Sequence, residues 1–182
     1  HRVPASAQAG ADALRAGGNA VDAAIAAMLA SFVAEPLLTG LGAGGLMTIA
    51  EPDGRVVCLD FFVETPGRGA DPAARAELLP WEVDFGDATQ VFNAGPASAG
   101  TPGTVAGIAH ASTRYGRLAL AELTRPAAAL AREGVTLNAQ QAYVVWLLDG
   151  IVRSTPECAA IFTRDGELLA EGDTVRQPEM AD

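Results

Sequence analysis

The sequence has 182 residues, enough for one domain with a hydrophobic core and too few to make two domains the first expectation. Its 22 acidic and 12 basic residues give a formal charge of −10, which repels polyanions and excludes nucleic acid as an expected partner. All twelve basic residues are arginine, so a lysine Schiff base or general base is excluded, whereas bidentate binding of a carboxylate is not.

The sequence contains no pattern that indicates a membrane-spanning segment, a metal site or a cofactor site. The longest uncharged apolar run, Ala23–Ala34, is shorter than the roughly twenty residues that span a bilayer. Asp12 and Asp22 precede it where a signal peptide carries basic residues, so the compartment stays open, with the cytoplasm slightly favoured. Cys58 and Cys158 match no metal-binding spacing, and we expect both to be buried as small apolar side chains. We expect no membrane partner, metal or cofactor.

Two helices are predicted near the start of the chain. Ala5–Ala16 is rich in alanine and is followed by the stop signal Gly17-Gly18. Asn19 is a good N-cap for the second helix, Asp22 occupies a capping-box position, and Pro36 ends the helix. Apolar residues at helical spacing predict that this helix packs into the core: Val21, Ile25, Met28, Leu29 and Phe32.

A glycine-rich stretch, Gly40–Gly45, precedes two apolar runs. The runs Leu46–Ala50 and Arg55–Phe62 are joined by a Pro-Asp-Gly turn and predict a β-hairpin. Apolar residues in both alternating sets predict inner strands covered on both faces. The glycines fit G-x-G-x-x-G, but a dinucleotide site follows a strand and opens a helix, which is the reverse order. We therefore predict no nucleotide binding, and expect the glycines to allow close backbone packing against a partner subunit.

Residues 64–100 are rich in glycine and proline with little periodicity, which predicts a long irregular loop of the functional or mobile kind. A helix ending at Tyr115 is expected next. Thr101 is a candidate cap, Pro102 fits the first turn, and Gly116 is the stop.

Three further helices are predicted. They are Leu118–Leu123, Pro126–Glu133 closed by Gly134, and Ala139–Asp149 capped by Asn138. For the last of these, the expected buried side is Tyr143, Val144, Trp146 and Leu147.

The end of the chain carries two more signals. Arg164-Asp165-Gly166 lies between Ile161–Thr163 and Leu168–Leu169, as in a short hairpin. The residues from Gln177 to Asp182 have the pattern of a helix opening, and a domain rarely ends on a first turn. We therefore expect a fragment of a longer polypeptide.

Ordered blocks along nearly the whole chain resemble the large subunit of gamma-glutamyltransferases. The blocks are Ala16–Ala24, Glu35-Pro36, Gly42–Gly45, Leu59–Phe61, Thr101–Gly107, Tyr115-Gly116, Pro126-Ala127, Leu130–Gly134, Glu171–Asp173 and Gln177-Pro178. The resemblance implies an α+β fold, as a fragment of the αββα sandwich of N-terminal-nucleophile hydrolases.

The resemblance also implies a precursor that cuts itself, so that a threonine becomes the first residue of a small subunit. That nucleophile would lie beyond Asp182, and His1 cannot serve as one, so we expect no catalytic residue in this chain. The implied partners are the small-subunit half of the same precursor and a small-molecule amide or peptide substrate. Self-association into a homo-oligomer is left open.

One departure from the family pattern concerns substrate binding. The family strand continues Asp-Phe-Arg-Glu, and its arginine pairs with the α-carboxylate of the glutamyl group, whereas Phe62 stands at that position here. A buried carboxylate needs a cationic partner, so either another arginine reaches the site or the acyl group lacks that carboxylate. Arg68 is the nearest candidate; it and Glu64 are equally consistent with solvated loop positions.

Two other polar residues have weaker claims. His110 has no serine or cysteine at a spacing that makes a nucleophile–base pair, which favours a position on a helix surface. Asp60 at a strand end favours a structural role, as an acceptor for nearby backbone N–H groups.

Three functions are therefore weighed. The first is a gamma-glutamyltransferase-like enzyme acting through a threonine acyl-enzyme. The second is a related acylase for a different amide, and the third is a catalytically silent fragment that only binds or assembles.

Overall fold

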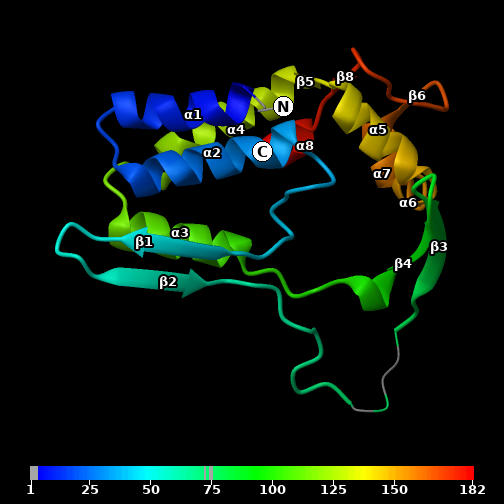
Figure 1. Cartoon of the computed structure of the whole chain (residues 1–182), viewed down its shortest axis with the longest axis horizontal. Coiled ribbons are helices and arrows are strands. Elements are labelled where there is room, and N and C mark those ends of the chain that lie inside the picture. The colour runs from blue at the N-terminus through cyan, green and yellow to red at the C-terminus, as the bar shows by residue number, and fades with distance from the viewer. Residues whose placement is uncertain (1–3, 72, 74–75) are drawn as a thin grey trace. The chain divides into compact units, whose positions relative to one another are not determined.

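A computed structural model describes residues 4–71, 73 and 76–182; His1 and Pro72 lie outside them. The chain folds as two compact units, each made of non-contiguous stretches. The first contains the described part of His1–Glu64, Gly100–Glu133 and Pro178–Asp182, and the second contains Thr65–Ala99 and Gly134–Gln177 (Figure 1). That residues 1–182 act as a single domain stays a prediction.

The first unit is built around helices that pack on α2. Its helices are α1 (Pro4–Arg15), α2 (Ala20–Ala34), α3 (Thr104–Tyr115), α4 (Leu120–Glu133) and α8 (Pro178–Ala181). Helix α2 contacts α1, α3 and α4, and Ile25, Ala26 and Ala30 are almost completely buried between them. Small side chains permit close approach: a Cβ on Gly10 of α1 would lie 3.0 Å from the carbonyl oxygen of Ala23.

The predicted capping box of α2 is confirmed. The Asn19 side chain accepts hydrogen bonds from the N–H groups of Val21 and Asp22, and the Asp22 carboxylate accepts one from the Asn19 N–H at 2.8 Å. Both side chains also act across the fold. Asn19 Nδ2 donates to the carbonyl oxygen of Tyr115 at 2.7 Å, and Asp22 accepts from the N–H of Arg117. The start of α2 is thereby joined to the end of α3.

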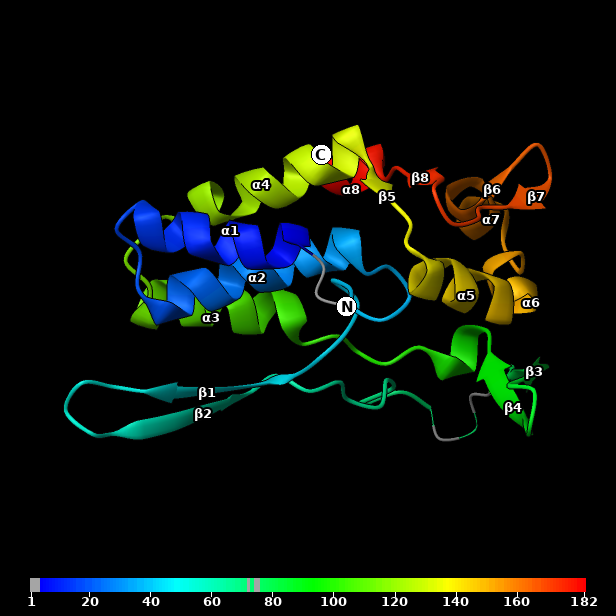
Figure 2. The same cartoon turned by 45° about the horizontal axis from the view of Figure 1, so that its top comes forward.

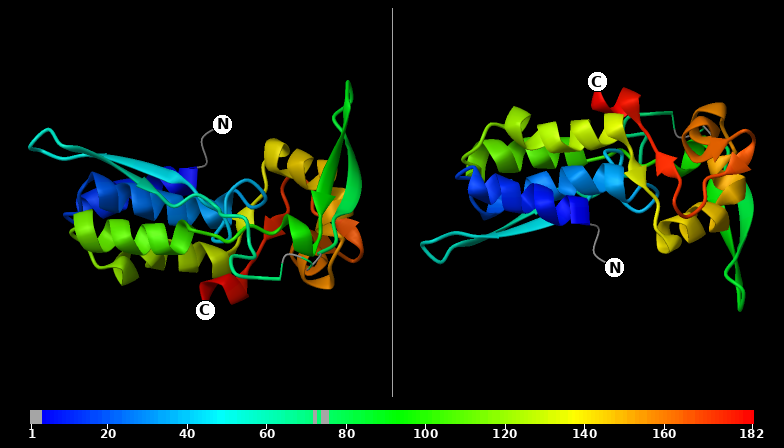
Figure 3. Two further views of the ribbon diagram at one scale, coloured as in Figure 1. Left: turned by 90° about the horizontal axis from the view of Figure 1, so that it is seen from below. Right: turned by 90° about the horizontal axis from the view of Figure 1, so that it is seen from above.

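The predicted hairpin is present as β1 (Leu46–Ala50) and β2 (Val56–Asp60), paired antiparallel with Ile49 opposite Val57. Ile49 is buried on the side where β2 meets α3, whereas Leu46 and Val56, each 64% exposed, lie on the other face. Within the described residues the hairpin is therefore covered on one face only. Cys58 lies on the open face and is exposed, so its predicted burial is wrong. The hairpin turn extends beyond the helices (Figures 2 and 3).

Two predicted helix boundaries are wrong. Helix α3 begins at Thr104 with Gly103 as its N-cap, because Thr101 instead pairs with Glu64 through two backbone hydrogen bonds of 2.8 and 3.1 Å. Pro126 lies inside a single helix α4, where two helices were expected. The loss of one backbone donor at proline is offset by burial of the stripe Leu123, Ala127 and Ala131.

The second unit contains a hairpin that the sequence pattern did not predict. Strands β3 (Leu79–Asp84) and β4 (Thr89–Ala94) lie inside the predicted irregular loop, followed by the short 3-10 helix η1 (Pro96–Ser98). Gly86 closes the turn with a φ of 92°, and Trp81 lies against Gly150. The alternation Trp81, Val83 was the available signal, and Pro80 at the start of β3 obscured it.

The rest of the second unit is a chain of short elements that begins and ends in paired strands. These are β5 (Val135–Thr136), α5 (Ala139–Leu147), α6 (Asp149–Val152), α7 (Pro156–Phe162), β6 (Thr163–Arg164), β7 (Glu167–Leu168) and β8 (Thr174–Val175). Strand β5 pairs with β8, and β6 pairs with β7 as the predicted short hairpin, with positive φ at Asp165 and Gly166.

The core of this stretch differs from the prediction. Its buried residues are Leu137, Val145, Val152, Phe162, Leu169 and Val175. Asn138 caps α5 as predicted, but Val145 is the buried residue of that helix, whereas Tyr143 and Trp146 are exposed. The buried face of α5 therefore differs from the predicted one by a rotation of about one residue. Cys158 is exposed, which also contradicts its prediction.

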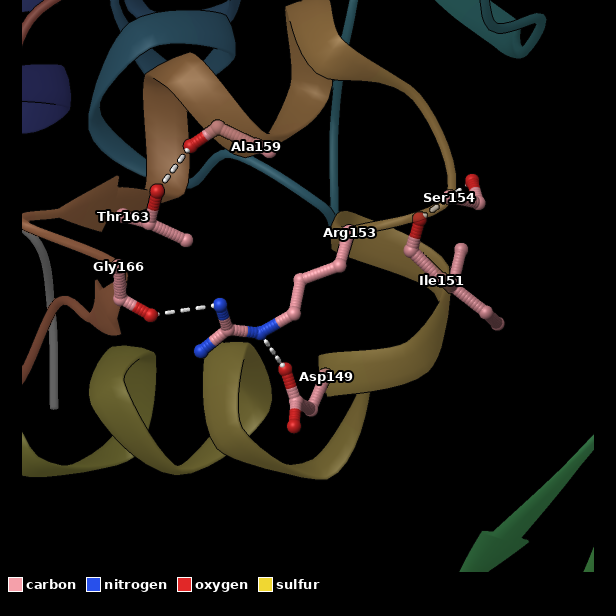
Figure 4. Close-up of polar contacts among 7 residues, drawn as sticks. All are labelled: Asp149, Ile151, Arg153, Ser154, Ala159, Thr163 and Gly166. Carbon is pink, nitrogen blue, oxygen red and sulfur yellow. Dashed lines mark hydrogen bonds and ion pairs between the residues drawn. The ribbon is translucent and has the colours of Figure 1, made fainter.

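Arg153 ties α6 to the β6–β7 turn (Figure 4). Its Nε pairs with Asp149 one turn earlier, and its NH1 group donates to the carbonyl oxygen of Gly166 at 2.7 Å. The guanidinium group of Arg153 therefore stabilises the turn that contains Asp165 and Gly166.

Candidate functional site

The first unit contains an open cleft of about 510 Å³ along β2 and the start of α3. One wall is formed by residues 58–62 and Glu64, and the other by residues 101–103, Ala106, Gly107 and His110. The two walls come from segments about forty residues apart in sequence, so the cleft exists only in the folded chain.

Backbone hydrogen bonds fix the wall that follows β2. Phe61 pairs with Gly45 through bonds of 3.0 and 3.3 Å, which continues the β1–β2 ladder by one step. Glu64 pairs with Thr101, which precedes α3. The strand end is thus attached to the glycine-rich stretch on one side and to the start of α3 on the other.

The glycine-rich stretch divides into two parts. A Cβ on Gly44 would overlap the backbone of Phe62 and Val63, and a Cβ on Gly45 would lie 3.1 Å from the Phe61 ring. A Cβ on Gly40 or Gly42 would have no other described residue beyond the chain neighbours within 4 Å. Close packing within the chain therefore accounts for Gly44 and Gly45 only. A strand follows these glycines, so they open no helix N-terminus.

Phe62 and Glu64, two of the three predicted binding residues, both line the cleft. Phe62 is 62% exposed, and its N–H donates to Asp60 Oδ1 at 3.0 Å, which agrees with the structural role favoured for Asp60. Arg68, the third candidate, belongs to the second unit and is not a lining residue, so its part in binding stays a prediction.

The charged groups of the cleft are acidic with one exception. Asp60 and Glu64 carry carboxylates, and His110 is the one lining residue whose side chain can become cationic. His110 is exposed on α3, as expected, with its ring centroid 6.4 Å from that of Tyr115. The lining residues include no arginine, so the cleft itself offers no guanidinium to a carboxylate. In the described part of the chain, no three His, Cys, Asp or Glu residues gather as a metal site requires.

Sequence reasoning missed the contribution of α3 to this cleft. Gly103, Ala106, Gly107 and His110 recur at helical spacing, which places them on one face of α3. Three of the four are small, and that pattern was the available sign of a face on which another segment lies closely.

Comparison with solved structures defines the class of protein. The chain superimposes on gamma-glutamyltranspeptidase of Helicobacter pylori with a TM-score of 0.83 at 29% identity, covering 100% of this chain and 50% of that one. The described helices and strands therefore form a fragment of an N-terminal-nucleophile hydrolase fold, as the sequence predicted. No described helix is long and apolar enough to span a membrane.

Comparison of sequences gives the family. The family model "Gamma-glutamyltranspeptidase" matches residues 6–182, and the chain belongs to that family. It is 36% identical over 175 residues to the glutathione hydrolase proenzyme of Escherichia coli (strain K12), which covers 96% of this chain and 29% of that protein. It is also 35% identical over 182 residues to the acylase ACY 1 proenzyme of Pseudomonas sp. (strain SE83), covering 98% of this chain and 32% of that protein.

The chain thus spans about a third of the length of these two relatives. Both are named as proenzymes, one a hydrolase of glutathione and the other an acylase. Because the identity to these two relatives is nearly equal, sequence similarity does not distinguish a glutamyl group from another acyl group. The residues of the cleft bear on that choice.

Proposed function

We propose that this chain is the N-terminal part of the large subunit of an enzyme that transfers or hydrolyses a γ-glutamyl or related acyl amide. The reaction proceeds through a threonine acyl-enzyme whose nucleophile lies outside this chain. The observation that supports the proposal is the cleft beside Phe62, the residue for which the resemblance implies a position near the acyl group.

In this proposal the chain binds and orients the acyl group and does none of the bond making. Phe62 supplies an apolar wall, and Glu64 supplies a carboxylate suited to a cationic group such as a free amine. Fixed walls matter because an acyl group held in one orientation reacts as though its partner were at very high concentration. The backbone bonds of Phe61 and Glu64 supply that fixity.

A second candidate function, an acylase for a non-glutamyl amide, is supported by a specific observation. A γ-glutamyl group carries a free α-carboxylate, and the lining residues present Asp60, Glu64 and Phe62 but no arginine. Two carboxylates and a phenyl ring disfavour a third carboxylate, unless Arg68 or a group from outside the chain neutralises it. A 4-aminobutanoyl group, which is a γ-glutamyl group without that carboxylate, avoids the conflict.

The proposed partner is the small-subunit half of the same precursor. Its contact surface includes the open face of the β1–β2 hairpin, where Leu46 and Val56 are exposed. Exposed apolar residues on a two-stranded hairpin are the expected mark of a surface that is covered in the complete protein.

The test uses the complete precursor, expressed so that it can process itself. We expect it to split into two chains and to hydrolyse an acyl anilide, with 4-aminobutanoyl anilide preferred over γ-glutamyl anilide. The 182-residue chain by itself should be inactive on both, since it lacks an N-terminal Thr, Ser or Cys. A processed protein that hydrolyses neither anilide would contradict the proposal, and so would activity of the 182-residue chain abolished by a point change within it.

A further inference from the structure

Five glycines surround the three residues that follow β2. Gly44 and Gly45 lie on one side of residues 61–63, and Gly100, Gly103 and Gly107 lie on the other; we call this set the glycine slot. None of the five has a positive φ, unlike the turn glycines of the chain. Each is therefore required for the space it leaves and not for the backbone conformation it permits.

A Cβ at any of the five positions would be crowded, and at Gly44, Gly103 and Gly107 it would overlap neighbouring atoms. A Cβ on Gly107 would overlap the ring of Phe61, and a Cβ on Gly103 would overlap its carbonyl oxygen. A Cβ on Gly100 would lie 3.1 Å from that of Val63. The Phe61 ring is thus wedged between the glycine-rich stretch and the first turns of α3.

Phe61 itself lines the cleft from the β2 side, next to Phe62 and three residues before Glu64. Gly107, on which its ring rests, lies between Ala106 and His110 on the opposite wall. The ring is therefore the spacer between the two walls. Protein interiors are packed closely enough that a change of one methyl group in such a contact must move something.

We propose that Phe61 is a positioning residue for acyl specificity, acting through Phe62. Its ring, seated in the glycine slot, sets the separation between Phe62 and the face of α3, and this separation selects the acyl group. The inference rests on the proposed function, since it assigns the determinant of specificity within that same cleft.

The test measures the ratio of kcat/KM for 4-aminobutanoyl and γ-glutamyl anilides in the processed protein. This ratio does not depend on how much of each preparation is folded, so a purely structural role leaves it unchanged. In Gly107→Ala the added methyl group displaces the ring, and we expect the ratio to change by at least about tenfold, the lower end of the effect of one methylene in an apolar pocket. The double variant Phe61→Leu/Gly107→Ala frees the space again and should return the ratio towards the original value.

Gly116→Ala is the matched control. Its Cβ would lie 2.6 Å from Asp22 Oδ1, so it is equally crowded, but Gly116 is not a cleft residue. We expect it to lower stability and leave the ratio unchanged. The inference is overturned if Gly107→Ala leaves the ratio unchanged or if Gly116→Ala shifts it as much. Should Gly107→Ala not fold, Phe61→Leu alone must shift the ratio. A parent protein inactive on both anilides overturns the proposed function, and this inference with it.

Discussion

The carboxylate of Asp22 accepts hydrogen bonds from the backbone N–H of Arg117 at 3.0 and 3.1 Å, across 95 positions of sequence. Asp22 is completely buried, and it also accepts from the N–H groups of Asn19 and Leu118. One side chain therefore caps α2 and holds the connection between α3 and α4. The residue that the sequence identifies as part of a local helix cap thus also makes a contact between segments that are distant in sequence.

Asp22→Ala should destabilise the protein strongly. It removes a completely buried carboxylate and leaves the backbone N–H groups of Asn19, Arg117 and Leu118, which are partly buried, without their acceptor. We expect a loss of about 2–4 kcal/mol in unfolding free energy. Asp12→Ala is the control, because Asp12 pairs with Arg15 at the surface of α1, where both side chains are more than half exposed; it should cost less than about 0.5 kcal/mol. Urea unfolding of the processed protein distinguishes the two, and equal midpoints would refute the role of Asp22.

Phe62→Arg should move specificity towards γ-glutamyl donors. A bidentate pair with the α-carboxylate in a partly desolvated site contributes on the order of 2–5 kcal/mol, which corresponds to roughly 30-fold to several thousand-fold in kcat/KM. Phe62→Leu is the control, since it keeps an apolar wall and adds no charge. Arg68→Ala tests the alternative clamp: a large loss on the γ-glutamyl donor alone would assign the carboxylate to Arg68. If the parent strongly prefers γ-glutamyl anilide and neither Phe62→Arg nor Arg68→Ala changes that preference, the placement of the acyl pocket is wrong.

The isolated 182-residue chain should self-associate through the open face of β1–β2. Leu46 and Val56 are each 64% exposed there, and a bare two-stranded hairpin also leaves unpaired edges. Val56→Lys should reduce association, measured by light scattering against protein concentration. Val91→Lys, which introduces the same change at an exposed strand position of β4, should reduce it less. A monodisperse monomer of the unmodified chain would contradict this expectation.

Arg153→Ala should loosen the β6–β7 turn locally. The side chain is about one-third exposed, so loss of its bonds to Asp149 and Gly166 is expected to cost only about 1 kcal/mol. Arg153→Lys keeps the charge, but an ammonium group lacks the planar guanidinium that reaches Asp149 and Gly166 at once. Its loss of stability should be more than half of that of Arg153→Ala. Hydrogen exchange of residues 163–168 measures this in the processed protein. Unchanged protection in Arg153→Ala would show that the turn is held by its own backbone.

Local signals predicted the elements whose ends are set by short-range chemistry. The Asn19 and Asn138 caps and the Asp165-Gly166 turn are examples, because each depends on residues within three or four positions. Elements decided by packing were less predictable. Pro126 was expected to begin a separate helix, but α4 continues through it, because Leu123 and Ala127 are buried against the core.

The candidate site shows the same division. Phe62 and Glu64 were predicted from the family pattern at the end of a recognisable strand, whereas Gly107 and His110 were not assigned to the site. Their part depends on the approach of α3 to β2: the small residues at helical spacing mark a face of α3, but they do not identify the segment that lies on it. Trp146 was placed on the wrong side of α5, because the aromatic pair with Tyr143 has the spacing of a core stripe although it is exposed.

The pairing of β5 with β8 has a consequence for how this family can change in length. The two strands are antiparallel: the chain leaves α4 at Gly134, and when it comes back at Arg176 it lies next to the point where it left. It then enters α8. Arg132 and Asp182, on either side of that segment, are already joined by an ion pair of 2.8 Å. The segment between β5 and β8 therefore begins and ends at neighbouring points of the fold. We expect evolution to have lengthened, shortened or exchanged it without altering the register of α4 and α8.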